Sequence, residues 1–280
     1  MTTVDAERQS RGLRRLSLRQ PLLALIIAAL LLPLVPLLAW AVSERWRYPA
    51  LFPQKLSTRG LRIITDPRSQ VLPGLLTSVV IGISVAVAAT LIGLPAGRAI
   101  GVYRFRGRRL VQFLLLSPVI VPGLAVTLGI QVFFIRYGLA GTTLGVVLVQ
   151  LLPTVPYAAT VLGAAFANLD LDYERQARAL GAGPMRTLLF VTIPLLRPAL
   201  ILTGLFCFLI SWSEYILTLL VGTGQVQTLP LLLFAAIGSS DTTAAAALGV
   251  LVVLPPLILV ALSGRLLRGQ SGATIGLGRL

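Results

Sequence analysis

Long stretches without a charged side chain recur along this 280-residue chain. Asp, Glu, Lys and Arg are all missing from residues 69–97, 110–135, 137–169, 198–213 and 215–240. About 20 consecutive apolar residues are needed for a helix to cross the hydrocarbon core of a bilayer. Charged residues make up 12% of the chain, about half of what a soluble domain carries. The sequence therefore predicts an all-α, polytopic membrane protein.

Six transmembrane helices are expected, over about 21–42, 72–99, 110–135, 143–167, 195–221 and 243–263. They divide the chain into a basic tail at 1–20, a first transmembrane helix within 21–43, an external interfacial segment at 44–70, a core of five helices at 71–268 and a second tail at 269–280. A cleaved signal peptide is the alternative for the first helix, because Ala39-Trp40-Ala41 imitates a cleavage site. The apolar run is longer than such a peptide needs, which favours an uncut helix.

Basic residues are distributed unevenly about these spans. Five lie in the N-terminal tail, five in 98–109, four in 175–197 and three in the C-terminal tail, 17 in all, against seven on the opposite side. The positive-inside rule then places both termini and these segments in the cytoplasm. The net charge of +15 follows this membrane pattern, and no motif of a nucleic-acid-binding fold accompanies it.

Several chemistries are excluded by composition. The chain has no His, and its single Cys207 lies in an apolar run, so a Cys/His metal site or a disulfide is not available. The only lysine, Lys55, follows Gln54 and therefore belongs to no nucleotide-binding loop. If ATP drives this protein, another subunit must hydrolyse it.

Glycine and proline mark the apolar spans. Gly93, Gly97 and Gly101 are spaced for close packing of one helix on another. Prolines at most spans remove backbone hydrogen bonds and are expected to kink or interrupt helices.

The segment 169–194 is more polar than a short connection requires. Leu169, Tyr173, Ala177 and Leu180 fall on one face of a helix, which we expect to lie against the protein, with the charged side chains toward the cytoplasm. Those charged side chains are Glu174, Arg175 and Arg178.

A turn is expected after this helix. Gly181 is placed to end the helix, and Pro184 suits the first position of a second one. Two interpretations remain open: an amphipathic loop on the lipid headgroups, or a rigid knob that docks into a cleft of a soluble partner.

The stretch "ERQARALGAGPMRTLLFVTIPLLRP" resembles the EAA loop of permease subunits of binding-protein-dependent ABC importers, and the resemblance covers roughly residues 72–268. It implies a type I importer permease in the bacterial inner membrane that works by alternating access. It also implies two ATPase subunits, a second permease subunit and an external substrate-binding protein as partners. ATP and Mg would bind the ATPase, and this chain would bind no cofactor.

The resemblance carries a set of ATPase-coupling residues: Glu174, Arg175, Ala177, Arg178, Gly181, Ala182, Pro184 and Met185. The match is imperfect at its start. Counting back from Gly181, the E-A-A triplet falls on Arg175, Gln176 and Ala177, so the glutamate is displaced by one position to Glu174. Either Glu174 replaces it in the ATPase contact, or Arg175 makes a different one.

Polar residues inside the spans are candidates for a translocation path or gate: Glu214, Ser211, Ser213, Gln131 and Gln150. An acid within a span is costly and usually faces the bundle interior or a water-filled path. Glu214 can equally be a structural hydrogen-bonding group.

Two cargo classes are suggested by resemblance. "ALGAGP" looks like permeases for polyamines, ferric iron, thiamine or phosphonates, and this group is preferred. "SWSEY" and "LLRGQSGA" look like permeases for carbohydrates and glycerol phosphate.

Rivals of other classes are a secondary transporter, a membrane-embedded enzyme and a membrane scaffold. The first lacks the expected inverted repeats, and the second lacks a nucleophile or metal set. A scaffold is separated from a permease by whether changes at Glu174 or Gly181 abolish ATP-driven uptake.

Overall fold

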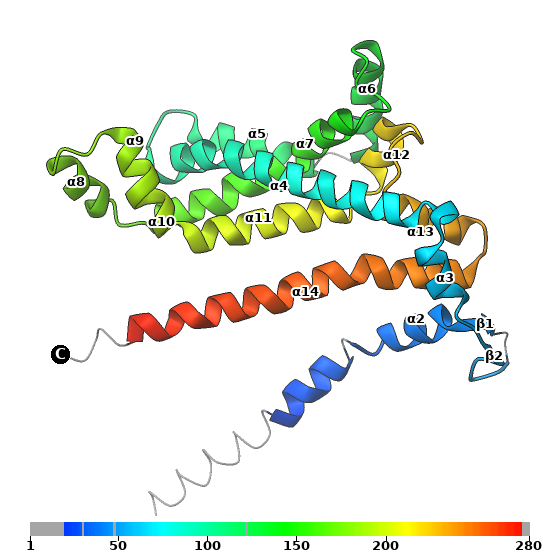
Figure 1. Cartoon of the computed structure of the whole chain (residues 1–280). Coiled ribbons are helices and arrows are strands. Elements are labelled where there is room, and N and C mark those ends of the chain that lie inside the picture. The colour runs from blue at the N-terminus through cyan, green and yellow to red at the C-terminus, as the bar shows by residue number, and fades with distance from the viewer. Residues whose placement is uncertain (1–19, 30, 47–48, 121–122, 276–280) are drawn as a thin grey trace, which may run out of the picture. The chain divides into compact units, whose positions relative to one another are not determined.

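The computed structural model describes residues 20–275 apart from residues 30, 47–48 and 121–122 (Figure 1). The predicted N-terminal basic tail, except its last residue, and the end of the C-terminal tail lie outside the described residues. The described residues are mostly helical, as expected, and they include a two-stranded hairpin. The chain forms two compact units. One comprises the residues up to Ile64 with Ala236–Val250, and the other comprises Thr65–Ala235 with the residues from Leu251 on.

The first unit contains the helix Gln20–Ala29, α2 (Leu34–Ala41), β1 (Ser43–Arg45), β2 (Lys55–Leu56) and nearly all of α3 (Arg59–Thr65). The antiparallel strands β1 and β2 lie within the segment predicted to be external, apart from Ser43 at the start of β1. The guanidinium of Arg59 pairs with Asp241, and Thr243 Oγ1 donates a hydrogen bond of 2.8 Å to the carbonyl of Ser43. These contacts hold residues near position 240 against the hairpin and α3.

The second unit is built from the elements η1 (Pro67–Ser69), α4 (Val71–Val102), α5 (Arg108–Ile120), α6 (Gly123–Arg136), α7 (Thr143–Ala167), α8 (Asp172–Ala179), α9 (Pro184–Thr187), the π-helical η2 (Leu188–Thr192), α10 (Ile193–Leu195), α11 (Arg197–Trp212) and α12 (Ile216–Gly222). Two further helices, α13 (Leu229–Gly238) and α14 (Thr242–Ile275), contribute residues to both units.

Three described helices are long and apolar enough to cross a membrane: α4, α7 and residues 242–261 of α14. The number rises to five if each of two bent helix pairs counts as one span. The predicted third span corresponds to α5 and α6, with residues 121–122 between them outside the described residues. The helices are consistent with the six spans expected from the sequence.

The predicted fifth span is not one continuous helix, which corrects that expectation. The helical segment Pro184–Leu195 meets α11 at an angle of 75°, because Pro194 and Pro198 cannot donate backbone hydrogen bonds there. Helix α11 then ends at Trp212, and α12 begins only at Ile216.

Glycines hold α4 close to α7. A Cβ atom built on Gly97 would lie 2.8 Å from the backbone nitrogen of Gly163, and one on Gly93 would lie 2.6 Å from the Cβ of Ala158. Gly101 approaches Phe166 in the same way, at 2.7 Å. The predicted close helix packing is therefore confirmed. Because backbones separated by so little leave no room for side chains, this pair is a rigid part of the fold.

Helix α11 completes the core by packing on α4 and α7. Its Cys207 is buried with Ala86, Ala89 and Ala158, and the ring of Phe208 covers Gly82. Three helices are thus locked side by side, and the connection formed by α8, α9 and α10 lies at one end of them (Figure 1).

Candidate functional site

The segment 169–194 forms two short helices joined by a glycine turn, as predicted. Gly181 adopts a left-handed conformation, with φ of +87°. Its N–H donates to the carbonyl of Arg178 at 2.9 Å, and the N–H of Ala182 donates to Ala177 at 3.0 Å. This pair of bonds is a Schellman motif, which satisfies the last carbonyls of a helix. Pro184 begins α9, so both predicted boundaries are confirmed.

Glu174 faces inward, and the expectation that it points toward the cytoplasm was wrong. It is only 5% exposed. Both of its carboxylate oxygens accept hydrogen bonds from Arg98 at the end of α4, from Nη1 at 3.0 Å and Nη2 at 2.6 Å. The guanidinium of Arg98 is mostly buried and also lies 5.7 Å from the ring centre of Phe166. A buried guanidinium needs a charged partner, and Glu174 supplies it.

A third side chain completes this arrangement, which we call the anchor (Arg98, Glu174 and Thr192). Thr192 is fully buried, and its Oγ1 donates to Glu174 Oε1 at 2.6 Å. It closes the π-helical turn that precedes Pro194, where the missing proline N–H disturbs the regular helix. The anchor thereby ties α8 to both α4 and the start of the α10–α11 connection.

The anchor keeps Glu174 ionised. Burial by itself raises the pKa of this carboxyl, but hydrogen bonds from Arg98 and Thr192, with the charges of Arg98 and Arg178, outweigh burial and lower the pKa overall. Arg178 contributes from a longer distance, with its Nη2 3.9 Å from Oε2 of Glu174. The carboxylate is therefore charged at neutral pH and already fully paired within the chain.

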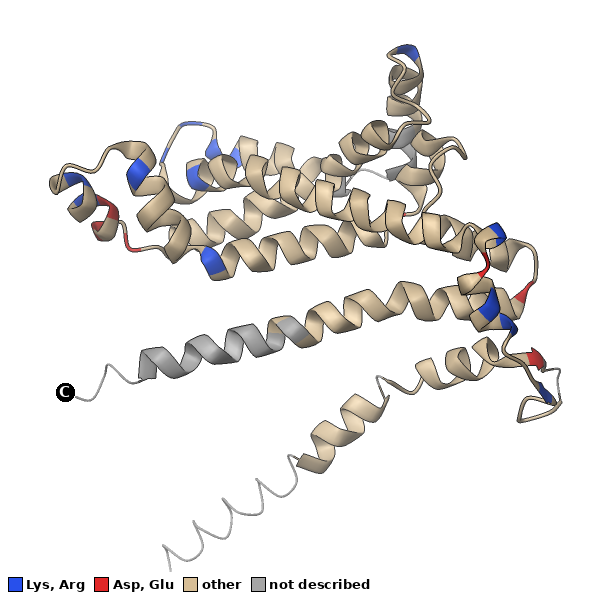
Figure 2. Ribbon diagram, in the orientation of Figure 1, with Lys and Arg blue, Asp and Glu red and all other residues tan. Residues whose placement is uncertain are grey.

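The outer surface of the loop carries most of the remaining predicted coupling residues. In the expected apolar face, Leu169 and Ala177 are half-buried, but Tyr173 and Leu180 are exposed and Leu180 reaches 89%, so only half of this face lies against the protein. Arg175, Arg178 and Met185 are also exposed, whereas Ala177 and Ala182 are half-buried. Because Glu174 points inward to Arg98, the side chains of Arg175 and Arg178 on the same helix are exposed. In Figure 2 the ribbon at this end of the unit carries several segments coloured as basic or acidic residues.

The predicted path or gate residues separate into two groups. Gln150 is buried and links two helices, because its Nε2 donates to Thr218 at 2.9 Å while its Oε1 accepts from Ser211. The backbone N–H of Leu217 donates to Oε1 of Glu214 at 3.0 Å. Glu214 therefore caps the first turn of α12, at the break that divides the predicted fifth span.

The two other candidates lie apart from this network. Ser213 is exposed and bonds to the backbone of its own helix, and Gln131 is half-buried in α6. The structure thus brings together Gln150 and Ser211 through side-chain contact, with Thr218 as the third member.

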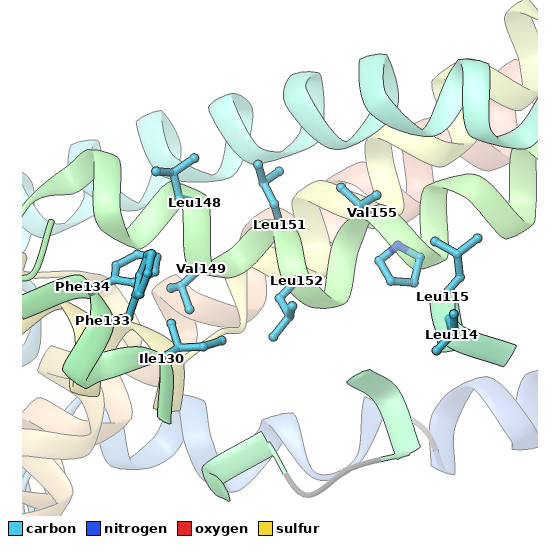
Figure 3. Close-up of a pocket in the computed structure, with 11 residues that line it drawn as sticks. Leu114, Leu115, Ile130, Phe133, Phe134, Leu148, Val149, Leu151, Leu152 and Val155 are labelled. Carbon is cyan, nitrogen blue, oxygen red and sulfur yellow. The ribbon is translucent and has the colours of Figure 1, made fainter. Parts of the chain in front are cut away.

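A pocket of about 520 Å³ lies between α5, α6 and α7 (Figure 3). All 11 side chains that line it are apolar: Leu114, Leu115, Ile130, Phe133, Phe134, Leu148, Val149, Leu151, Leu152, Val155 and Pro156. Such a lining suits hydrocarbon and offers no polar side chain to a charged or hydroxylated solute. None of the predicted path residues is among the lining residues.

Comparison with known proteins agrees with this arrangement. The family described as binding-protein-dependent transport system inner membrane components matches residues 89–270, which include both the anchor and the loop. The chain belongs to this family.

Individual relatives of this permease support the same assignment. The molybdenum transport system permease protein ModB of Mycobacterium tuberculosis is 31% identical, over 84% of this chain and 89% of that protein. The spermidine/putrescine transport system permease protein PotC of Haemophilus influenzae is 26% identical, over 66% and 72%. The trehalose transport system permease protein SugB of M. tuberculosis is 29% identical, over 72% and 76%.

The fold is also similar to a chain of a bacterial ABC transporter involved in the import of the acidic polysaccharide alginate. The TM-score is 0.62 at 19% identity, covering 95% of this chain and 98% of that one. The family match identifies the protein as a non-catalytic permease subunit of an ATP-driven importer, in which a separate ATPase hydrolyses ATP.

Sequence reasoning missed two members of the anchor in this permease. Arg98 falls inside the predicted second span, and a charge in such a position calls for a partner. That signal could have led to Glu174, whereas nothing in the local sequence marks Thr192.

Proposed function

We propose that residues 169–194 are the coupling loop through which this permease receives movement from its ATPase subunit. The observation that carries the proposal is the anchor. A loop that only lay on lipid would not need a buried, two-pronged ion pair to fix its direction. Two prongs between Arg98 and Glu174 restrict rotation as well as distance, because both groups are planar.

The path of the movement follows from the contacts. A push on α8 is carried through Glu174 to Arg98 at the end of α4, and through Thr192 to the segment leading into α11. Helix α4 is in turn held against α7 by Gly93 and Gly97. The loop and the three core helices therefore act as one rigid lever in the transition between inward-open and outward-open states.

The proposal includes the remaining partners and the orientation. The loop, the segment 98–109 and both termini face the cytoplasm, supported by 17 basic residues on that side against seven on the other. A second permease subunit completes the translocation path, and an external binding protein delivers the cargo. ATP and Mg bind the ATPase subunit.

Neither cargo class suggested by the sequence is excluded. Relatives named for spermidine/putrescine and for trehalose both match, as does one named for molybdenum. Glu214 supports a cationic cargo less than its position suggested, because its carboxylate caps α12. We assign Glu214 and Gln150 to holding the break between α11 and α12 in shape, and cargo selection to the binding protein.

The test is a bulky substitution at the turn. A Cβ on Gly183 would meet nothing within 4 Å, and Gly183 has an extended backbone with φ of −68° that any residue can adopt. Gly183→Trp is therefore compatible with the fold. Gly181→Trp is less informative, because its positive φ strains any side chain.

The tagged permease, co-expressed with its ATPase and purified in mild detergent, is compared with Gly183→Trp by mass spectrometry of stoichiometric partners. We expect wild type to retain the ATPase and Gly183→Trp to lose it. Gly238→Trp is the control, because this exposed glycine also has open space around it and lies outside the loop. Equal retention by all three proteins would overturn the coupling role.

A further inference from the structure

The exposed tip of the loop shows what kind of surface receives it. We define the tip as the side chains around the glycine turn that point away from the core: Arg178, Leu180, Met185 and Arg186. The two apolar members are 89% and 66% exposed, and both arginines are exposed as well. One arginine precedes the turn and the other follows it, so basic groups flank an apolar centre.

The charge of the tip follows from the anchor. Glu174 is the acidic residue nearest the turn, and Arg98 already engages both of its oxygens. Asp172 lies further back on α8 and pairs with Arg175. The surface around the turn is left with the positive charges of Arg178 and Arg186. Arg178 retains only the 3.9 Å approach to Glu174.

The backbone of the turn is exposed at Gly181 and Gly183. Added Cβ atoms at Gly181 and Gly183 would both meet open space, so another protein surface can approach the main chain closely there. An amphipathic helix lying on a membrane needs a continuous apolar face along its length. In α8 that face is interrupted, because Ala177 is half-buried while Tyr173 and Leu180 are exposed. A protein cleft fits these observations better than a lipid surface.

We infer that the tip docks into an apolar cleft of the ATPase subunit whose rim is acidic, with Arg178 and Arg186 meeting carboxylates and Leu180 and Met185 filling the cleft. The inference rests on the proposed coupling role and specifies its chemistry. Glu174 then makes no contact with the ATPase. Its negative charge pairs with Arg98 inside the permease, and the charges presented to the ATPase are positive.

The experiment measures how much ATPase subunit co-purifies with the full-length permease carrying Arg178→Glu and Arg186→Glu together. We expect at least about a tenfold loss of retention, because like charges then face each other across the contact. Substituting Lys for the carboxylates on the ATPase cleft, singly and in pairs, is expected to restore retention. The matched control is Arg104→Glu with Arg106→Glu, which changes the same charge on exposed residues outside the loop, and it should retain the ATPase within about twofold.

The apolar part is tested separately with Leu180→Ser and Met185→Ser. We expect a loss of retention in this variant that persists at high salt, where the contribution of exposed charges is screened. Wild-type retention should weaken as salt is raised, and that of the double Arg→Glu variant should not weaken further.

Several results would overturn the inference. One is wild-type retention by the double Arg→Glu variant, and another is a loss that no reversed carboxylate on the ATPase restores. A third is that the double Arg→Glu variant loses the ATPase only in nanodiscs of phosphatidylglycerol and retains it normally in nanodiscs of phosphatidylcholine. That result would show that the arginines face anionic headgroups. If Gly183→Trp releases the ATPase while charge reversal does not, the coupling role stands and only the acidic rim is refuted.

Discussion

Arg98 and Glu174 are joined by two parallel hydrogen bonds of 3.0 and 2.6 Å, although 76 positions separate them in the sequence. One residue closes a membrane-spanning helix, and the other lies in the loop that follows a different one. The pair explains why the loop has a fixed direction, and the consequences of that direction can be measured.

Removing Glu174 should strongly destabilise the permease. Glu174→Ala leaves the mostly buried guanidinium of Arg98 without its counter-ion, and breaking a buried pair from one side costs about 3–5 kcal/mol. The double variant Arg98→Ala/Glu174→Ala should lose clearly less than the two single variants together, because no unpaired charge remains. Thermal unfolding of the four proteins in one detergent measures this difference, and additive losses would contradict the ion pair.

Acid should remove the contribution of the anchor. The pKa of Glu174 is lowered in the folded chain, so the stabilisation is complete above the ordinary range of a glutamate and is lost as pH falls through the lowered value. The unfolding temperature of wild type should exceed that of Glu174→Gln by a constant amount near neutral pH. That difference should shrink between about pH 5 and pH 3. A difference that grows on acidification would mean that the pKa is raised instead.

Close contact between α4 and α7 should make Gly97 intolerant of any side chain. Gly97→Val forces atoms against the backbone nitrogen of Gly163 at 2.8 Å and should cost about 1–3 kcal/mol by overpacking. Gly163→Ala is the matched control in the facing helix, because its added Cβ would have an ordinary contact at 3.6 Å. Similar unfolding temperatures for the two variants would show that the helices are not held this closely.

Glu214 should act as a hydrogen-bond acceptor rather than as a charge. Glu214→Gln keeps an oxygen for the N–H of Leu217 and should preserve most ATP-driven uptake. Glu214→Ala loses the cap and about 1 kcal/mol of stability. Uptake into proteoliposomes with the binding protein and its identified ligand provides the measurement. Abolished uptake with an intact fold in Glu214→Gln would show instead that the carboxylate binds a cationic cargo.

Parts of this fold follow directly from the sequence. The helix α7 spans the residues predicted for it, and α4 differs from its prediction by a few residues at the ends, because long apolar runs bounded by polar residues leave little choice in a membrane. The turn at Gly181 and the start at Pro184 also follow from local backbone chemistry.

Other features depend on partners that are distant in the chain. The periodicity of α8 places Tyr173 and Leu180 on one side, and from that pattern an inward apolar face is the natural expectation. The buried charge of Arg98 reverses it, since satisfying a guanidinium outweighs covering two apolar side chains. The interruption after Trp212 was equally hidden, because it depends on Glu214 capping a new helix within an apolar stretch.

The central claim is that Glu174 works inside the permease while the tip of the loop contacts the ATPase. The most direct measurement is the stoichiometry of ATPase subunit that co-purifies with Glu174→Gln and with Gly183→Trp, each compared with wild type at a temperature where both variants remain folded. We predict that Glu174→Gln retains the ATPase at nearly the wild-type level and that Gly183→Trp loses it. Loss of the ATPase from Glu174→Gln as complete as from Gly183→Trp would show that Glu174 itself contacts the ATPase, and would contradict this account.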